Sequence, residues 1–132
     1  MTAAREPAPL RIARATRRLV AMTRFYREAL GFAVVDQFTG HAGYTGVIFA
    51  LPGGIELEIT QHERGRSAAP PDPDDLLVIY LPSSSRVALA RARLEVLGHA
   101  SVEPVNPWWR SRSVTFADPD GWRIVLCDGA DR

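Results

Sequence analysis

Two glutamates occupy alternate positions in a short stretch whose other residues are mostly apolar. In Ile55–Thr60 the odd positions are apolar, and the even positions carry Glu56, Glu58 and Thr60. Because successive side chains of a strand point to opposite faces, we expect both carboxylates on one face. A solvated outer face is one interpretation. The other, favoured by the internal repeat described below, is that at least one glutamate points into a groove, where Glu58 is a candidate general base.

Two histidines are further candidates for chemistry. His41 stands beside Tyr44 in the glycine-containing segment 39–45, which we expect to be a flexible loop, and His62 follows the strand of the glutamates. An ordinary surface role is the alternative for His62. Cys127 is the only cysteine, so an internal disulfide is excluded. With no histidine near it in the sequence, we expect a buried, inert thiol rather than a nucleophile.

Aromatic side chains supply two further candidate contacts. The stiff motif Asn-Pro-Trp-Trp at residues 106–109 presents the two indoles of Trp108 and Trp109. We expect at least one of them at a groove mouth or a subunit contact, where it can stack on a planar or cationic ligand, although ordinary core packing is the alternative. Tyr80 shares strand parity with Leu76 and is expected to enter a cavity.

The elements that must position these residues are repeated. A shift of 67 residues aligns 21–60 with 88–127 and gives 12 identities in 40 pairs. The pairs include a Leu-Gly step and a Phe-Ala-x-Pro-x-Gly motif in each half. Shared composition explains such matched turn residues less well than duplication does, so we infer that the chain contains two copies of one structural unit.

Each copy has the same predicted order of elements. The first has strands at 10–15, 33–38, 46–51 and 55–60 and a helix from Leu19 that Gly31 ends. The second has strands at 76–81, 100–105, 113–117 and 122–127 and a helix at 84–97 that Gly98 ends. The sequence thus predicts a single domain over 1–132 of the α+β class, with two tandem βαβββ modules, 10–62 and 76–128, and a linker at 63–75. We expect a curved mixed sheet or partial barrel around a cavity.

Composition excludes several classes of protein. The net charge of +1 gives no field that would favour nucleic acid, and no apolar run approaches the roughly 18 residues of a membrane helix. The start of the chain carries no apolar stretch, so we expect no signal peptide and a cytoplasmic location. All 16 basic residues are arginine, which excludes chemistry that needs a lysine. The string Arg14, Arg17, Arg18, Arg24 and Arg27 is expected to be a solvated face.

Two motifs carry a resemblance to a known family. Residues 24–32, RFYREALGF, and residues 116–126, FADPDGWRIVL, resemble signatures of the vicinal-oxygen-chelate superfamily. This superfamily includes glyoxalase I, extradiol dioxygenases and the fosfomycin- and bleomycin-resistance proteins. Residues 58–62, 106–109 and 118–123 resemble a subgroup of small bacterial glyoxalase-like proteins. The resemblance spans residues 10–128 and implies the superfamily's fold, without specifying an activity.

The resemblance also implies where a metal would be held. Its ligand positions fall at Arg11, Glu58, Leu76 and Val125, of which Glu58 alone can bind a cation. A shifted metal site of Glu58, His41 and His62 stays an alternative. Arg11 and Glu58 are expected to face each other, either as a plain ion pair or as a binding site for a ligand carboxylate, carbonyl or phosphate.

These observations together lead to one expected function and one alternative. We expect a cofactor-free, metal-independent binder of a small organic molecule, assembled as a homodimer. The alternative is a glyoxalase-like lyase or isomerase, or a dioxygenase, that uses Glu58 as base or metal ligand, with His41 as a second possible base. Which of the two glutamates lies deeper stays open. The expected ligand-binding residues are Arg11, Tyr44, Glu56, Glu58, Tyr80, Trp108, Trp109, Arg123 and Val125.

Overall fold

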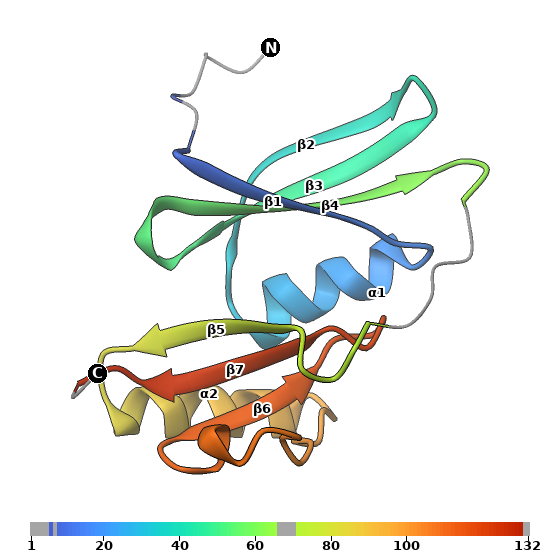
Figure 1. Ribbon diagram of the computed structural model, residues 1–132. Coiled ribbons are helices and arrows are strands. Elements are labelled where there is room, and N and C mark those ends of the chain that lie inside the picture. The colour runs from blue at the N-terminus through green and yellow to red at the C-terminus, as the bar shows by residue number, and fades with distance from the viewer. Residues whose placement is uncertain (1–5, 7, 66–70, 131–132) are drawn as a thin grey trace.

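The first half of the chain folds as a four-stranded mixed sheet with a helix on one face (Figure 1). The computed structural model describes residues 6, 8–65 and 71–130. Strand β1 pairs in parallel with β4, and the order of this sheet, called sheet A, is β1-β4-β3-β2. Its elements are β1 (Leu10–Ala15), α1 (Leu19–Arg24), a π-helical turn (Phe25–Ala29), β2 (Ala33–His41), β3 (Tyr44–Leu51), a short 3-10 turn (Pro52–Gly54) and β4 (Ile55–His62).

The second half repeats this plan with one strand fewer. Strand β5 pairs in parallel with β7, and the order of this sheet, called sheet B, is β5-β7-β6. Its elements are β5 (Leu76–Leu81), α2 (Ser84–Val96), a 3-10 turn (Pro107–Arg110), β6 (Ser113–Ala117) and β7 (Arg123–Asp128). The predicted α+β class is confirmed, and the two mixed sheets do not close into a barrel.

One apolar core joins the two halves. Side chains of α1 and the π-helical turn, such as Met22 and Phe25, are fully buried in a cluster that contains Phe49 and Leu57 of sheet A and Ile124 of sheet B. Figure 1 accordingly shows α1 between the two sheets. Burial of large apolar side chains is the main favourable term in folding, so α1 holds the halves together.

Glycines end both helical segments as predicted. Gly31 has φ of 77° and Gly98 has φ of 90°, a conformation that side-chain-bearing residues rarely adopt. At the other end of α2, the hydroxyl of Ser83 accepts a hydrogen bond from the N–H of Arg86, which satisfies one of the unpaired donors of the first turn.

The strand predicted at residues 100–105 is wrong. This segment is tied to β6 by a backbone hydrogen bond of 2.8 Å from the N–H of Val102 to the carbonyl of Thr115, but it builds no regular strand. Pro104 lies within the segment and has no N–H to donate to a ladder, which explains why pairing does not continue.

The flexible loop predicted for residues 39–45 is also wrong. Strand β2 runs to His41 and β3 starts at Tyr44, so the connection is a two-residue turn. Ala42 and Gly43 both have positive φ, 51° and 85°, as in the hairpin turns whose twist matches that of the strands. Strand β4 likewise continues to His62. Of the predicted linker at 63–75, residues 66–70 lie outside the described residues, and the rest forms no helix or strand.

The turn between β6 and β7 contacts the first half through polar side chains. The buried hydroxyl of Tyr26 donates to Asp118 Oδ2 at 2.6 Å, and the hydroxyl of Thr16 donates to Asp120 Oδ2 at 2.6 Å. The guanidinium of Arg14 lies 4.1 Å from the ring centroid of Trp122. The prediction that Arg14 is part of a solvated face is therefore wrong, because β1 turns this side chain toward the second half.

The helices of the described part of the chain are short. None of them is long and apolar enough to cross a membrane.

Candidate functional site

The face of sheet A that points away from α1 carries the predicted carboxylates. Leu57 and Ile59 are fully buried on the α1 side, so the alternating Glu56 and Glu58 lie on the other face, which we call the polar face. Strand pairing places Arg11 opposite Glu56 on this face. Both glutamates therefore point away from the core, as their spacing predicts, and Glu56 is the more deeply buried of the two.

Arg11 bridges the two glutamates. Its Nε and Nη2 donate to Glu56 Oε1 at 3.1 and 2.8 Å, and its Nη1 donates to Glu58 Oε1 at 2.9 Å. The hydrogen bond to Glu56 is the largest contribution that raises the pKa of Arg11 above its usual value, so this guanidinium stays charged. All three guanidinium nitrogens are thus engaged by carboxylates of the neighbouring strand.

The histidines and Tyr44 form one row at the far end of the polar face. Tyr44 pairs with His41 on one side and with His62 on the other, and the rings of Tyr44 and His62 meet edge to face with centroids 4.6 Å apart. His62 lies four residues beyond Glu58 on β4, about 13 Å along the strand at about 3.3 Å per residue. Glu58 and this row are therefore separate features of the same face.

The predicted residues of the second half share a face of sheet B. Leu77, Ile124 and other residues of the alternate parity contact the core, so Tyr80, Arg123 and Val125 lie on the opposite, outer face. Val125 is fully buried, whereas Tyr80 is exposed. The Nη1 of Arg123 donates to the carbonyl of Glu103 at 2.9 Å. Arg123 is thereby fixed within its own module.

The two indoles differ in their surroundings. Asn106 Oδ1 accepts from the N–H of Trp108 at 3.0 Å and starts the 3-10 turn that carries both residues. Trp108 is 76% exposed, whereas Trp109 is half-buried beside β6. Trp108 therefore offers the free ring face that stacking on a planar ligand requires.

The sole thiol is placed as an unreactive group. Cys127 is buried, and burial is the main cause that raises its pKa, opposed by the charge of Arg112. The neutral thiol is thus favoured, and a thiolate nucleophile is not.

One chain does not bring these two sets of residues together. The polar face of sheet A points away from α1, and α1 lies between sheet A and sheet B (Figure 1). Arg11 and Glu58 are therefore separated from Tyr80 and Val125 by the core of the chain. A groove lined by both sets needs a further surface, such as that of a second copy.

The donor set does not fit a protein-held metal ion at the positions that the resemblance implies. Of Arg11, Glu58, Leu76 and Val125, Glu58 alone has a donor for a cation, and its Oε1 is bound by Arg11. Within residues 6, 8–65 and 71–130, no three side chains of His, Cys, Asp or Glu lie close enough together to hold an ion.

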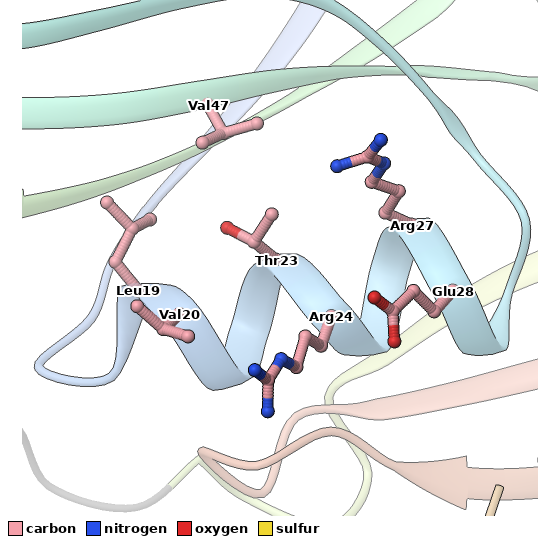
Figure 2. Close-up of a pocket in the computed structure, with 7 residues that line it drawn as sticks. All are labelled: Leu19, Val20, Thr23, Arg24, Arg27, Glu28 and Val47. Carbon is pink, nitrogen blue, oxygen red and sulfur yellow. The ribbon is translucent and has the colours of Figure 1, made fainter.

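A pocket of about 280 Å³ lies on the other side of sheet A, which the sequence analysis missed (Figure 2). It runs along α1 and the start of the π-helical turn, under β3. The sequence showed its arginines only as members of a solvated face. The available signal was the spacing of Leu19, Thr23 and Arg27, which places an apolar side chain, a hydroxyl and a guanidinium on one side of a helix. The pocket is lined by Leu19, Val20, Thr23, Arg24, Arg27, Glu28 and Val47.

Comparison with family models and curated proteins gives consistent matches. The model of the YycE-like N-terminal domain matches residues 10–60, and that of the YycE-like C-terminal domain matches residues 74–128. The chain is 45% identical over 122 residues to the protein of Bacillus subtilis (strain 168) called Uncharacterized protein YycE. That match covers 92% of this chain and 88% of the relative.

Solved structures show the same similarity. The crystal structure of YycE from Bacillus subtilis matches with a TM-score of 0.86 and 43% identity, covering 94% of this chain and 91% of that one. A glyoxylase/bleomycin resistance protein/dioxygenase domain from Frankia sp. EAN1pec has a TM-score of 0.72 at 19% identity, covering 97% and 95%. A mutant of the fosfomycin resistance protein FosX of Listeria monocytogenes, in complex with Mn(II) and 1S,2S-dihydroxypropylphosphonic acid, has a TM-score of 0.68 at 15% identity, covering 96% and 92%. The two distant structures show the shared fold alone.

Proposed function

This chain belongs to the YycE-like family within the vicinal-oxygen-chelate superfamily, and from that premise we propose that it binds a small organic molecule without a metal ion. The observation that carries the proposal is the bridge of Arg11 to Glu56 and Glu58. A guanidinium held between two carboxylates supplies one positive charge at a place where a metal ion would otherwise supply the positive charge.

We place the ligand on the polar face of sheet A, in a groove that a second copy of the chain completes with the outer face of its sheet B. The location of Arg11 and Tyr80 on faces that one chain keeps apart supports this arrangement. The exposed ring of Trp108 is available to stack on a planar ligand at the rim. The FosX complex holds 1S,2S-dihydroxypropylphosphonic acid together with Mn(II), so a protein of this fold can accommodate a small organic acid. The buried free thiol fits a reducing cytoplasm.

A metal-free lyase or isomerase is the second candidate. Arg11 binds Oε1 of Glu58, and within the described residues no hydrogen bond engages Oε2. The carboxylate of Glu58 is half-buried and held by an arginine, so it is placed to act as a general base. The guanidinium of Arg11 is placed to stabilise a negatively charged oxygen of the substrate.

The decisive experiment combines metal analysis with a ligand screen. The purified protein is first assayed for bound metal. It is then screened by thermal shift against small metabolites, and each metabolite that binds is tested for conversion to a product. We expect less than stoichiometric metal, unchanged stability after chelation, and a ligand that raises the melting temperature without being converted. Glu58→Gln should weaken the binding of that ligand, whereas Glu63→Gln, at an exposed loop position, should leave the binding unchanged.

Two results would replace the proposal. Stoichiometric metal held at this face would establish a metal site. Turnover of the ligand with a bell-shaped pH profile that Glu58→Gln abolishes would establish the second candidate.

A further inference from the structure

The pocket along α1 has the composition of a binding site for an anion with an apolar body. We propose that it binds a small carboxylate, with Arg27 holding the carboxylate group and Leu19 and Val47 contacting the apolar part. This site lies on the α1 side of sheet A, opposite the polar face, because Val47 belongs to the core cluster that packs on α1. It is therefore independent of the ligand site proposed above.

The spacing of residues along the helix determines which side chains face the pocket. Leu19, Thr23 and Arg27 follow one another at intervals of four residues, so they form one stripe along the helical segment. In Figure 2 these three side chains point toward the strand that carries Val47, whereas Arg24 points to the other side of the helix. Two apolar side chains, one hydroxyl and one guanidinium thus face the same space.

The charges at the pocket favour an anion. Arg24, Arg27 and Glu28 are the charged residues that line it, and of the two arginines Arg27 points toward the strand that carries Val47, so its guanidinium is the positive charge placed to meet the ligand. Other arginines make ion pairs, for example Arg11, Arg18 and Arg110, but Arg24 and Arg27 have no carboxylate within ion-pair distance among the described residues. A planar guanidinium without a partner is suited to bind a carboxylate through two parallel hydrogen bonds.

The size and backbone of the pocket restrict the ligand further. A volume of about 280 Å³ is near the lower end of small-molecule sites and suits a substituted benzoate better than a nucleotide. Arg27 belongs to a π-helical turn, in which the N–H of Leu30 reaches the carbonyl of Phe25 at 3.0 Å. Such turns are rare in proteins, and many of those that occur lie at functional sites.

Benzoate is the probe that tests this inference. In a titration of isotope-labelled protein followed by amide NMR shifts, benzoate should cause saturable shifts at residues 19–28 and 46–48. Benzamide, which is neutral, should bind more weakly, and benzamidine, which is cationic, should not bind there. Arg27→Gln should weaken benzoate binding about tenfold, because the charge-assisted hydrogen bonds are lost. The matched control is Arg64→Gln, an exposed arginine outside the pocket, which should change nothing.

Three results would overturn the inference. The first is a benzoate response that stays linear to high concentration. The second is a response centred on Arg11 and Glu58 instead of the pocket. The third is an affinity for benzoate that Arg27→Gln leaves unchanged.

Discussion

The hydroxyl of Tyr26 donates to Asp118, and both side chains are buried. Loss of this hydrogen bond therefore costs more of the free energy of unfolding than loss of an exposed polar contact would. Tyr26→Phe removes the donor and leaves Asp118 Oδ2 without this hydrogen bond. We expect a loss of about 1–3 kcal/mol in the free energy of unfolding, measured by urea denaturation. Tyr44→Phe is the control, since its exposed ring has no hydroxyl hydrogen bond among the described residues. Equal stability of Tyr26→Phe and the unchanged protein would contradict this role.

The same tyrosine should make the free energy of unfolding fall as the pH rises into the alkaline range. Burial is the main cause that raises the pKa of Tyr26 above its ordinary value of 10.0, followed by the charge of Asp118. Above that ordinary value the unfolded chain releases this proton while the folded chain keeps it. The unfolded state then binds fewer protons, so stability falls as pH rises, by up to about 1.4 kcal/mol per pH unit.

Urea denaturation at about pH 9 and about pH 11 tests this dependence. The unchanged protein should lose more stability between the two values than Tyr26→Phe loses. The thiol of Cys127, whose pKa burial raises from 9.0, adds a decline in both proteins, so the difference between them isolates Tyr26. Parallel declines would show that Tyr26 releases its proton as readily in the folded chain as in the unfolded one.

At the scale of elements, both residues of the β2–β3 hairpin turn have positive φ, but glycine occupies the second position alone. Ala42 adopts a φ of 51°, which strains a residue with a Cβ. Gly43 has a φ of 85°, and a Cβ there would lie 2.6 Å from Nε2 of His62. Ala42→Gly should therefore stabilise the protein by about 0.5–1 kcal/mol, and Gly43→Ala should destabilise it by about 1–2 kcal/mol. Melting temperatures of the two variants measure this, and shifts of the same sign would refute the argument.

Elements with a repeating local signal were predictable, and those set by a single residue or by packing were not. The alternation in 55–60 predicted which face carries Glu56 and Glu58, and Gly31 and Gly98 end their helices as expected. The repeat led to a strand at 100–105 that Pro104 prevents. The π-helical turn was missed because the spacing of the apolar residues suits an α-helix equally well.

The candidate site was predictable only in part for a related reason. Strand alternation fixes the face on which a side chain lies, but not its partner on another strand. The expectation that Arg11 faces Glu58 came from the family resemblance, and the pairing of Arg11 with Glu56 was not predicted. The pocket at Arg27 depends on how β3 lies over α1, which no local pattern encodes. The functional roles of these residues remain predictions.

For the whole molecule, the separation of the polar face of sheet A from the outer face of sheet B predicts a symmetric dimer. Light scattering at micromolar concentration should give a mass of twice 14.5 kDa, and the melting temperature should rise with protein concentration. A monomeric mass with ligand binding intact would contradict a shared groove.

Mixing subunits locates the groove itself. Glu58→Gln alters the sheet A side and Arg123→Gln alters the sheet B side, so each variant alone should bind the screened ligand poorly. If each groove takes one side from each copy, a mixed dimer has one groove with both changes and one with neither. Random mixing should then restore about one quarter of the sites, counted by titration with the ligand. A groove built within one chain would carry one change in every site, and mixing would restore none.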